Sequence, residues 1–236
     1  MDKKEFNQIE LHNISKTFIV GKGRHNIEAL IDISLSITEG EFVVIYGPSG
    51  CGKSTLLNTI IGFEKPTRGR VLIDGEDLYK LSEDIRSEYR SHKFGVVYQT
   101  QNWVKSLNSR ENVALPLIAQ SFSYNDAVED AERFIHKMNL QEFLKQMPTQ
   151  LSGGEQQKLG LARALISKPK IVLGDEPTGN LDSVSSDIVI GFLKELNTHY
   201  KRTVIIITHN HDYWNIGHRQ IEMKDGKIIK DSKNSG

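Results

Sequence analysis

Short, nearly continuous apolar runs occur at three places along the chain. They cover residues 42–46, 171–173 and 204–207, and most of their side chains are β-branched. A run of this kind fits a strand that is buried on both faces, as strands are in a parallel sheet. We therefore expect these runs to form the centre of one sheet.

Between these runs, apolar side chains recur at the spacing of an amphipathic helix. Ser123 and Asp126 form a capping-box pattern at the start of the second stripe. Strands that alternate with helices predict an α/β fold with a parallel, helix-flanked sheet. The helical stripes cover residues 56–61, 127–138, 159–166 and 189–196.

The chain departs from this alternation near both ends and in the middle. Residues 9–37 alternate like strands around a turn at Gly21-Lys22-Gly23, and residues 221–229 have a hairpin pattern around Asp225-Gly226. From about residue 112 to 166 helices dominate. This predicts one domain, 1–236, with an inserted helical subdomain at about 100–167. We interpret the lysine-rich tail, 224–233, as a solvated end.

Composition narrows the classes of function. The 236 residues contain 30 Lys+Arg and 30 Asp+Glu, a balance that argues against bare nucleic acid as the main partner. The single cysteine, Cys51, cannot form an intramolecular disulfide, so a reducing compartment is the natural setting. The N-terminus lacks a signal-peptide pattern, and no apolar run approaches the roughly 20 residues that span a bilayer. We expect any membrane part to belong to another chain.

A glycine-rich loop stands between the first apolar run and the first helical stripe. Residues 47–54, GPSGCGKS, match the pattern G-x-x-x-x-G-K-[ST]. In such a loop, successive N–H groups and the helix N-terminus point at phosphates. Lys53 is expected to reach the β- and γ-phosphates, and the Ser54 hydroxyl to ligate Mg²⁺. The alternative is an ordinary strand-to-helix turn, but the elements on both sides favour a nucleoside-triphosphate site.

Two acids end the second apolar run. Asp175 and Glu176 follow the strand directly, at the sheet edge where open α/β folds bind ligands. We expect Asp175 to hold Mg²⁺ through water, and Glu176 to polarise or deprotonate the water that attacks the γ-phosphate. Taken alone, such a pair is more often a helix cap or a solvated loop. The glycine loop favours the catalytic interpretation.

The run LSGGEQQ at residues 151–157 makes the assignment specific, because it resembles the signature of ABC-type ATPases. Ser152 and the glycine backbone could offer a hydroxyl, N–H donors and a helix dipole to a phosphate. The resemblance implies that Ser152, Gly153, Gly154 and Glu155 act in trans, on ATP held by the glycine loop of a second copy in an ATP-dependent homodimer. A helix N-terminus with a serine cap is the simpler alternative, but it does not explain the double glycine.

Other elements are similar to this family and fall in the expected order. Gln99 matches the glutamine that contacts Mg²⁺ and the attacking water, and Asp182 lies in a loop that resembles the one touching the opposite subunit. His209 resembles the switch histidine that bonds the γ-phosphate, although a lone histidine ending a strand is more often structural. Phe18 matches the aromatic that stacks on adenine, and its chemistry fits a core or edge aromatic equally well.

The resemblance implies ATP and Mg²⁺ as cofactors, and it divides the site residues into three sets. The catalytic set is Glu176, His209 and Gln99, and the metal set is Ser54, Gln99 and Asp175. The nucleotide-binding set is Phe18, Gly47, Pro48, Ser49, Gly50, Cys51, Gly52, Lys53, Ser54 and Thr55.

The resemblance spans residues 9–229, and residues 111–117 and 179–182 are similar to one group, the LolD/MacB/FtsE-like ATPases of lipoprotein release and macrolide export. It implies an N-terminal antiparallel β subdomain and an ATP hydrolase that works with an FtsX/MacB-like membrane permease. The chain is then expected to be cytoplasmic and held at the inner face of the cell membrane through that permease. Direct membrane insertion and nucleic-acid binding are not expected.

Two features depart from the family or occupy a variable position. Residues 101–105, QNWVK, replace the usual Phe-Asn-Leu-hydrophobic-Pro in the segment that faces the permease. Trp103 is therefore either an interface anchor or a tryptophan buried in the helical subdomain. Cys51 is interpreted as filler, and the alternative is redox-sensitive nucleotide binding.

Two other functions compete with a transporter ATPase. A soluble ABC-type ATPase of DNA repair or translation is the second hypothesis, but the coiled-coil or zinc insertions and the second ATPase domain of such proteins do not occur in this sequence. A regulatory module that binds nucleotide without hydrolysis is the third. The presence of Glu176, Gln99 and His209 argues against it. The sequence leaves the transported substrate and the direction of transport open.

Overall fold

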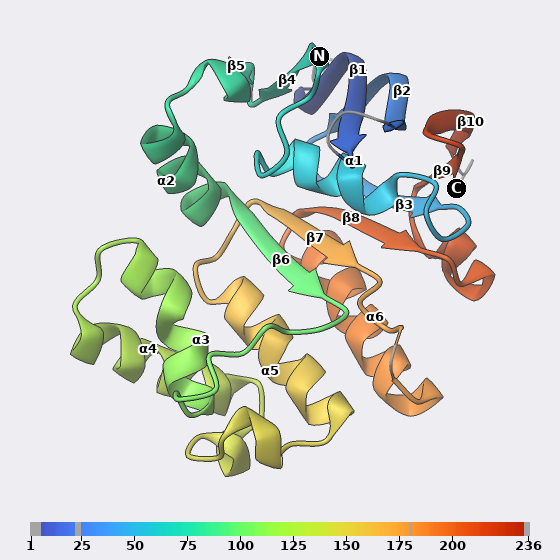
Figure 1. The fold of residues 1–236 in the computed structure, drawn as a ribbon. Coiled ribbons are helices and arrows are strands. Elements are labelled where there is room, and N and C mark those ends of the chain that lie inside the picture. The colour runs from blue at the N-terminus through green and yellow to red at the C-terminus, as the bar shows by residue number, and fades with distance from the viewer. Residues whose placement is uncertain (1–5, 22–24, 180, 234–236) are drawn as a thin grey trace, which may run out of the picture.

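The structure is a computed structural model, and it describes residues 6–21, 25–179 and 181–233. Its strands form two sheets, and helices cover the larger sheet (Figure 1). The turn predicted at Gly21-Lys22-Gly23 lies largely outside the described residues.

The smaller sheet is antiparallel at every pair of neighbouring strands. The alternation that predicts these strands is confirmed, because Ile9, Leu11 and Ile14 are buried while intervening side chains are more exposed. A period of two places Ile9 and Leu11 on the core face of the sheet, and a register shift between Leu11 and Ile14 brings Ile14 to the same face. The strand order is β2 (His25–Thr38), β1 (Asn7–Val20), β4 (Arg68–Ile73) and β5 (Glu76–Asp77).

The larger sheet contains the three apolar runs at its centre. Its neighbouring strands are parallel, except that the two C-terminal strands, 219–224 and 227–233, form an antiparallel pair. The run at 204–207 is at most 1% exposed, as expected for a strand covered on both faces. The predicted fold class is therefore confirmed. The strand order is β10 (Lys227–Lys233), β9 (Arg219–Lys224), β3 (Phe42–Tyr46), β8 (Thr203–Thr208), β7 (Ile171–Asp175) and β6 (Phe94–Tyr98).

Helices and the smaller sheet cover the two faces of the larger one. The helices are α1 (Lys53–Ile60), α2 (Glu83–Lys93), α3 (Ser109–Ala119), α4 (Tyr124–Lys137), α5 (Gly153–Leu165) and α6 (Ser183–Thr198). In Figure 1, α1 and the smaller sheet lie on one side of the larger sheet, and α5 and α6 lie on the other. Alternate side chains of β3, β7 and β8 pack against these two layers. The 3₁₀ turns are η1 (Leu78–Lys80), η2 (Gln141–Phe143), η3 (Pro148–Gln150) and η4 (His211–Ile216).

Helices α3 to α5 occupy the connection between the neighbouring strands β6 and β7. They have a hydrophobic cluster of their own, which includes Val113, Ala131 and Leu159. The first of these helices begins at Ser109, because Asn108 and Glu111 form a complete capping box there. The division into one domain with a helical subdomain at about 100–167 stays a prediction.

The C-terminal hairpin is confirmed, and the lysine-rich tail is mostly exposed, as predicted, but it is also ordered as a strand. Residues 227–233 form β10, which pairs with β9 along its length. Most of its side chains are exposed because it is an edge strand. Backbone pairing, and not side-chain burial, therefore orders this lysine-rich segment.

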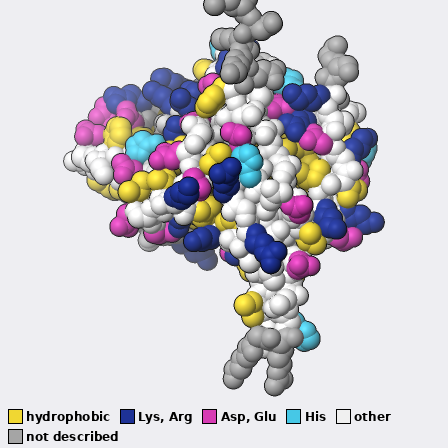
Figure 2. All heavy atoms as spheres, turned by 90° about the horizontal axis from the view of Figure 1, so that it is seen from above, with side chains coloured by type: hydrophobic (Ala, Val, Ile, Leu, Met, Phe, Trp, Pro, Cys, Tyr) yellow, Lys and Arg dark blue, Asp and Glu magenta, His cyan; other side chains and the backbone are white. Residues whose placement is uncertain are grey.

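None of the helices in the described part of the chain has the length and apolar character that crossing a bilayer requires. On the face seen from above, Lys and Arg side chains are interspersed with Asp and Glu (Figure 2). This mixture matches the balanced composition of the chain.

Candidate functional site

The glycine loop connects the end of β3 to the start of α1. Two of its glycines are required by close backbone contacts. A Cβ at Gly47 would lie 2.3 Å from the carbonyl oxygen of Met223, and a Cβ at Gly52 would lie 2.3 Å from that of Ala29. Gly52 also has φ +104°, a region that favours glycine. The loop is therefore held in one shape by β9 and β2.

Lys53 lies inside this loop and is 5% exposed. Its Nζ donates hydrogen bonds to the carbonyl oxygens of Gly47 at 2.7 Å and Pro48 at 3.0 Å. Cys51 Sγ is 4.0 Å from the same nitrogen, and the thiol is buried. The ammonium is thus positioned at the centre of the loop, where it neutralises backbone carbonyls that would otherwise repel a phosphate.

Ser54 and Asp175 meet although 121 residues separate them in sequence. The Ser54 hydroxyl donates to Asp175 Oδ1 over 3.3 Å. Burial raises the pKa of the Asp175 carboxyl, and the negative charge of Glu176 acts in the same direction, while Ser54 and Lys53 oppose the shift. This pair places a hydroxyl and a partly desolvated carboxylate at the N-terminus of α1.

Glu176 and His209 form the second pair at this sheet edge. His209 Nδ1 lies 2.8 Å from Glu176 Oε1, and the Glu176 side chain is 18% exposed while that of His209 is 52% exposed. Glu176 has φ +47°, which is uncommon for a residue with a side chain. Its N–H donates to the carbonyl of Ile207 at 2.9 Å, so β8 holds the backbone in this conformation.

A cavity of about 450 Å³ lies over the glycine loop. Six predicted nucleotide-binding residues line it, and Glu176 lines it as well. Those six are Ser49, Gly50, Gly52, Lys53, Ser54 and Thr55. A cavity lined by a glycine-rich helix N-terminus, a lysine and a carboxylate can hold a phosphate chain and a hydrolytic water.

The sequence interpretation missed a wall of this cavity. Ile27, Glu28 and Ala29 of β2, with Asp225 and Gly226 of the C-terminal hairpin, complete the lining. The hairpin turn is joined to the loop, because the Gly226 N–H donates to the Cys51 carbonyl at 3.0 Å. The turn pattern Asp225-Gly226 is visible in the sequence, but nothing in it shows that the turn would reach the loop.

Phe18 does not line this cavity. Its Cα pairs with that of Ile27, which does, and the ammonium of Lys16 lies 4.9 Å from the centre of the Phe18 ring. The ring is therefore on the strand pair that borders the cavity, with a cation already on one face. Its assignment to adenine stays a prediction.

Gln99 follows β6 and lines a different, smaller cavity of about 150 Å³. Gly153 from the signature run lines the same cavity. The Gln99 side chain also packs closely on Gly179, where a Cβ would lie 2.6 Å from Gln99 Nε2. Gln99 is thus placed between the signature helix and the loop that follows β7.

The signature run begins α5 with a complete capping box. Ser152 Oγ accepts from the Glu155 N–H at 3.4 Å, and Glu155 Oε2 accepts from the Ser152 N–H at 2.7 Å. A Cβ at Gly154 would lie 2.8 Å from Ser185 Oγ, so the second glycine lets α5 approach the start of α6. Packing therefore gives a physical reason for one glycine of the pair.

Asp182 caps that neighbouring helix. Its Oδ1 accepts from the Ser185 N–H at 2.9 Å and its Oδ2 from the Ser185 hydroxyl at 2.9 Å, which lowers the pKa of the carboxyl. Two positions before Asp182, Asn180 lies outside the described residues. Asp182 and Ser152 thus begin adjacent helices on one face.

The phosphate loop and the signature helix do not share a cavity within one copy. Lys53 and Ser54 line one cavity, and Gly153 lines the other with Gln99. The helix N-terminus carries an exposed Ser152 and shares no cavity with the phosphate loop of its own chain, so it is available to another molecule.

Comparison with known proteins decides the family. A protein-family model described as ABC transporter matches residues 30–179 of this chain, which include the glycine loop, the signature run and Asp175. The chain belongs to the ABC transporter ATP-binding family. The fold and the order of motifs described above agree with this assignment.

Relatives of similar length are ATP-binding proteins of this family. The chain is 42% identical to an uncharacterized ABC transporter ATP-binding protein, MJ0796, of Methanocaldococcus jannaschii, over 97% of this chain and 98% of the relative. It is 39% identical to the lipoprotein-releasing system ATP-binding protein LolD of Shewanella frigidimarina, over 92% and 90%. It is also 41% identical to the macrolide export ATP-binding/permease protein MacB of Aggregatibacter actinomycetemcomitans, but it spans only 35% of that protein.

A solved structure links the fold to hydrolysis. The dimeric, post-hydrolysis state of MJ0796 bound to ADP and Pi superimposes with a TM-score of 0.89 at 39% identity, over 97% of this chain and 99% of the other. The ABC ATPase fold, membership in the LolD/MacB group and the class of ATP hydrolase are therefore confirmed. The roles of individual site residues stay predictions.

Proposed function

We propose that this chain is the ATP-hydrolysing subunit of an ABC transporter and works as an ATP-dependent homodimer beside an FtsX/MacB-like permease. The single observation that carries the dimer is the separation of Lys53 and Gly153 into two cavities of one copy. Each copy offers a phosphate loop and an exposed signature serine, and two copies arranged head to tail bring one of each together twice.

In this proposal the glycine loop binds the phosphate chain. The N–H groups of Gly50, Gly52 and Lys53 and the dipole of α1 supply positive potential. The Lys53 ammonium exchanges its contacts with Gly47 and Pro48 for the β- and γ-phosphate oxygens. The buried stem of Lys53 limits how far the ammonium can move, which favours a fixed phosphate position.

Mg²⁺ is the expected metal, and the donors fit it. The Ser54 hydroxyl and Asp175 carboxylate, 3.3 Å apart, are hard oxygen ligands. Within the part of the chain that the structure describes, no three His, Cys, Asp or Glu side chains form a metal cage. Mg²⁺ is usually held by one or two protein groups together with substrate phosphates, so this small donor set is appropriate. When bound, it neutralises charge on the β- and γ-phosphates.

Glu176 and His209 would act on the attacking water and the γ-phosphate. The Glu176 carboxylate accepts a proton from the water, while its other contact with His209 Nδ1 fixes its direction. His209 remains half exposed and can turn toward the γ-phosphate when the dimer closes. Gln99 lines the cavity that contains Gly153, and the next two residues, Thr100 and Gln101, line both that cavity and the neighbouring surface, so Gln99 is placed to report closure to that surface.

That neighbouring surface is a groove of about 440 Å³ that includes Trp103 and Lys105. Trp103 is held rather than free, because its Nε1 donates to Gln156 at 3.1 Å and the Arg163 guanidinium lies 4.3 Å from its ring centre. The ring is partly buried against α5 and also lines the groove, and its role as an interface anchor stays a prediction. We assign this groove to the permease, which would keep the chain cytoplasmic and peripheral at the membrane.

The permease assignment is tested with Lys105→Glu, which reverses an exposed charge in the groove. Solubilised membranes are passed over immobilised wild-type chain, and the captured membrane protein is identified by mass spectrometry. We expect an FtsX/MacB-like permease, bound about fivefold more weakly by the variant, as for one interfacial charge of roughly 1 kcal/mol.

The matched control is Lys227→Glu, an equal charge change on the exposed strand β10. It should capture the permease as well as wild type does, and both variants should hydrolyse ATP at the wild-type rate. Equal capture by all three proteins, or capture of a permease of another class, contradicts the assignment.

A further inference from the structure

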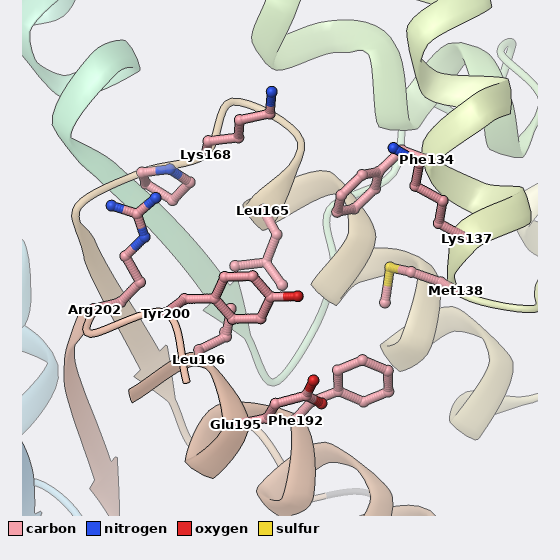
Figure 3. Close-up of a pocket in the computed structure, with 11 residues that line it drawn as sticks. Phe134, Lys137, Met138, Leu165, Lys168, Phe192, Glu195, Leu196, Tyr200 and Arg202 are labelled. Carbon is pink, nitrogen blue, oxygen red and sulfur yellow. The ribbon is translucent and has the colours of Figure 1, made fainter. Parts of the chain in front are cut away.

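A second large cavity lies away from the phosphate site and has no role in the proposed function. It measures about 530 Å³ and opens between α4, the loop from α5 to β7, and the end of α6 (Figure 3). It shares no lining residue with the cavity over the glycine loop. Its size is within the range of cavities that bind small molecules.

The walls of this cavity are apolar. Five side chains from three helices converge on it, and Tyr200 reaches across with its hydroxyl directed toward the side that carries Met138 (Figure 3). Leu165, one of the lining residues, is 7% exposed, so its side chain is a buried part of the wall. The converging side chains are Phe134, Met138, Leu165, Phe192 and Leu196.

A neighbouring cavity of about 190 Å³ shares the lining residues Met138 and Phe192 with it and extends along α6 to Ile188. We call these two adjoining cavities together the trough. Ile188 and Leu196 lie eight residues apart on α6, which corresponds to about 12 Å at 1.5 Å per residue. A long, narrow apolar trough fits a linear alkyl chain better than a compact ring system.

Cations dominate the rim. Lys137, Lys168 and Arg202 line the larger cavity against a single acid, Glu195. Among the described residues, none of these four side chains has an ion pair within 4.0 Å. Lys168 also has φ +51°, a conformation that glycine adopts more readily at a helix end. At this rim position the chain thus has a lysine, although a glycine would adopt the same backbone conformation with less strain.

We propose that this trough binds a free medium-chain fatty acid. The alkyl chain would lie against Met138 and Phe192, and the carboxylate would lie at the rim beside Lys168 and Arg202. Apolar burial supplies the affinity, and the uncompensated cations select an anion over a neutral or cationic head group. Such a ligand contacts α4 of the helical segment and α6 of the core at once.

The test uses decanoate, kept below the concentration at which it aggregates, and isothermal titration calorimetry on the intact chain. We expect saturable binding at one site per chain, with decanol and decyltrimethylammonium bound more weakly. Lys168→Glu, on an exposed residue, should weaken decanoate binding about fivefold, as loss and reversal of a rim charge imply. Leu196→Gln should weaken it as well, with circular dichroism confirming that the variant is folded. Lys227→Glu is the matched charge control and should bind as wild type does.

Three results would overturn the proposal. One is the absence of decanoate binding to wild type. Another is equal binding by wild type and Lys168→Glu, since it would place the ligand elsewhere. The third is binding to phosphatidylglycerol vesicles that Lys168→Glu abolishes while free decanoate does not bind, because the cations would then contact lipid head groups at a membrane surface.

Discussion

Single residues decide whether the phosphate loop can form. Gly52 combines φ +104° with a site where any Cβ would lie 2.3 Å from the Ala29 carbonyl oxygen. Gly52→Ala should therefore lower the free energy of unfolding by more than about 1 kcal/mol, measured by urea denaturation. Gly191→Ala is the control, because Gly191 is an exposed residue in the middle of α6 and a Cβ there would meet nothing within 4 Å. It should raise stability by up to about 1 kcal/mol. Equal stability of Gly52→Ala and wild type would contradict the geometry.

The position predicted to make Asp175 a metal ligand also lowers the stability of the folded protein. Because burial raises its pKa, the folded protein binds more protons than the unfolded chain between the unfolded and folded pKa values. Stability therefore falls as the pH rises through that window, and the deficit persists above it. Asp175→Asn should raise Tm at pH 7 in differential scanning fluorimetry and should lose the additional stabilisation that Mg²⁺ gives to the ATP-bound protein. A lower Tm for the variant without nucleotide would contradict this explanation.

At the scale of elements, the residue at the start of a helix can cap that helix and, in the proposed site, can also contact ATP. Ser152 caps α5 and Ser123 caps α4, each with its hydroxyl accepting from the N–H three residues on. Each Ser→Ala change should therefore cost about 1 kcal/mol of stability. Only Ser152→Ala should also slow steady-state ATP hydrolysis, with ATP binding by one copy unchanged. The measurements are urea denaturation, nucleotide titration and phosphate release. A loss of hydrolysis with Ser123→Ala as well would show that general destabilisation, and not the trans contact, causes the effect.

Elements with a local signal could be predicted from the sequence. The runs at 42–46 and 204–207 are buried strands because β-branched side chains need cover on both faces, and the capping pattern at Ser123 marks the start of α4. The hairpin pattern predicts β10 only as far as residue 229, and its continuation to Lys233 was missed, because pairing of an exposed edge depends on backbone hydrogen bonds that side-chain pattern does not encode. Strand order has the same limit, since β3 pairs with β8 between residues that are 162 positions apart in the sequence.

Site residues that belong to a local sequence motif could be predicted, and those that tertiary structure brings to the site from distant elements were missed. Lys53 lies in a glycine-loop motif after an apolar run, and Glu176 lies directly after another such run, so both could be predicted from local sequence. Both residues line the phosphate cavity. Glu28 and Asp225 complete that cavity from β2 and the last hairpin, and only tertiary structure shows their approach. Phe18 lies beside the cavity but not in its lining. The family resemblance, and not residue pattern alone, places the trans role on Ser152.

At the scale of the whole molecule, the chain has two half-sites on one protomer. The phosphate loop lines one cavity and the signature helix lines another, and in the function proposed above two copies together form a complete site. The related cassette MJ0796 has been solved as a dimer in a post-hydrolysis state with ADP and Pi. In the homodimer proposed for this chain, both ATP molecules would lie at the interface, and hydrolysis would reopen it.

The most direct test of this central claim is the oligomeric state of Glu176→Gln with ATP. Removal of the carboxylate base should lower the rate of hydrolysis by about 10²- to 10⁴-fold while the glycine loop still binds ATP. We therefore expect size-exclusion chromatography with light scattering to show a stable dimer with ATP and a monomer without nucleotide. Adding Ser152→Ala to the same chain should weaken that dimer. A Glu176→Gln variant that binds ATP yet remains monomeric would contradict the composite site.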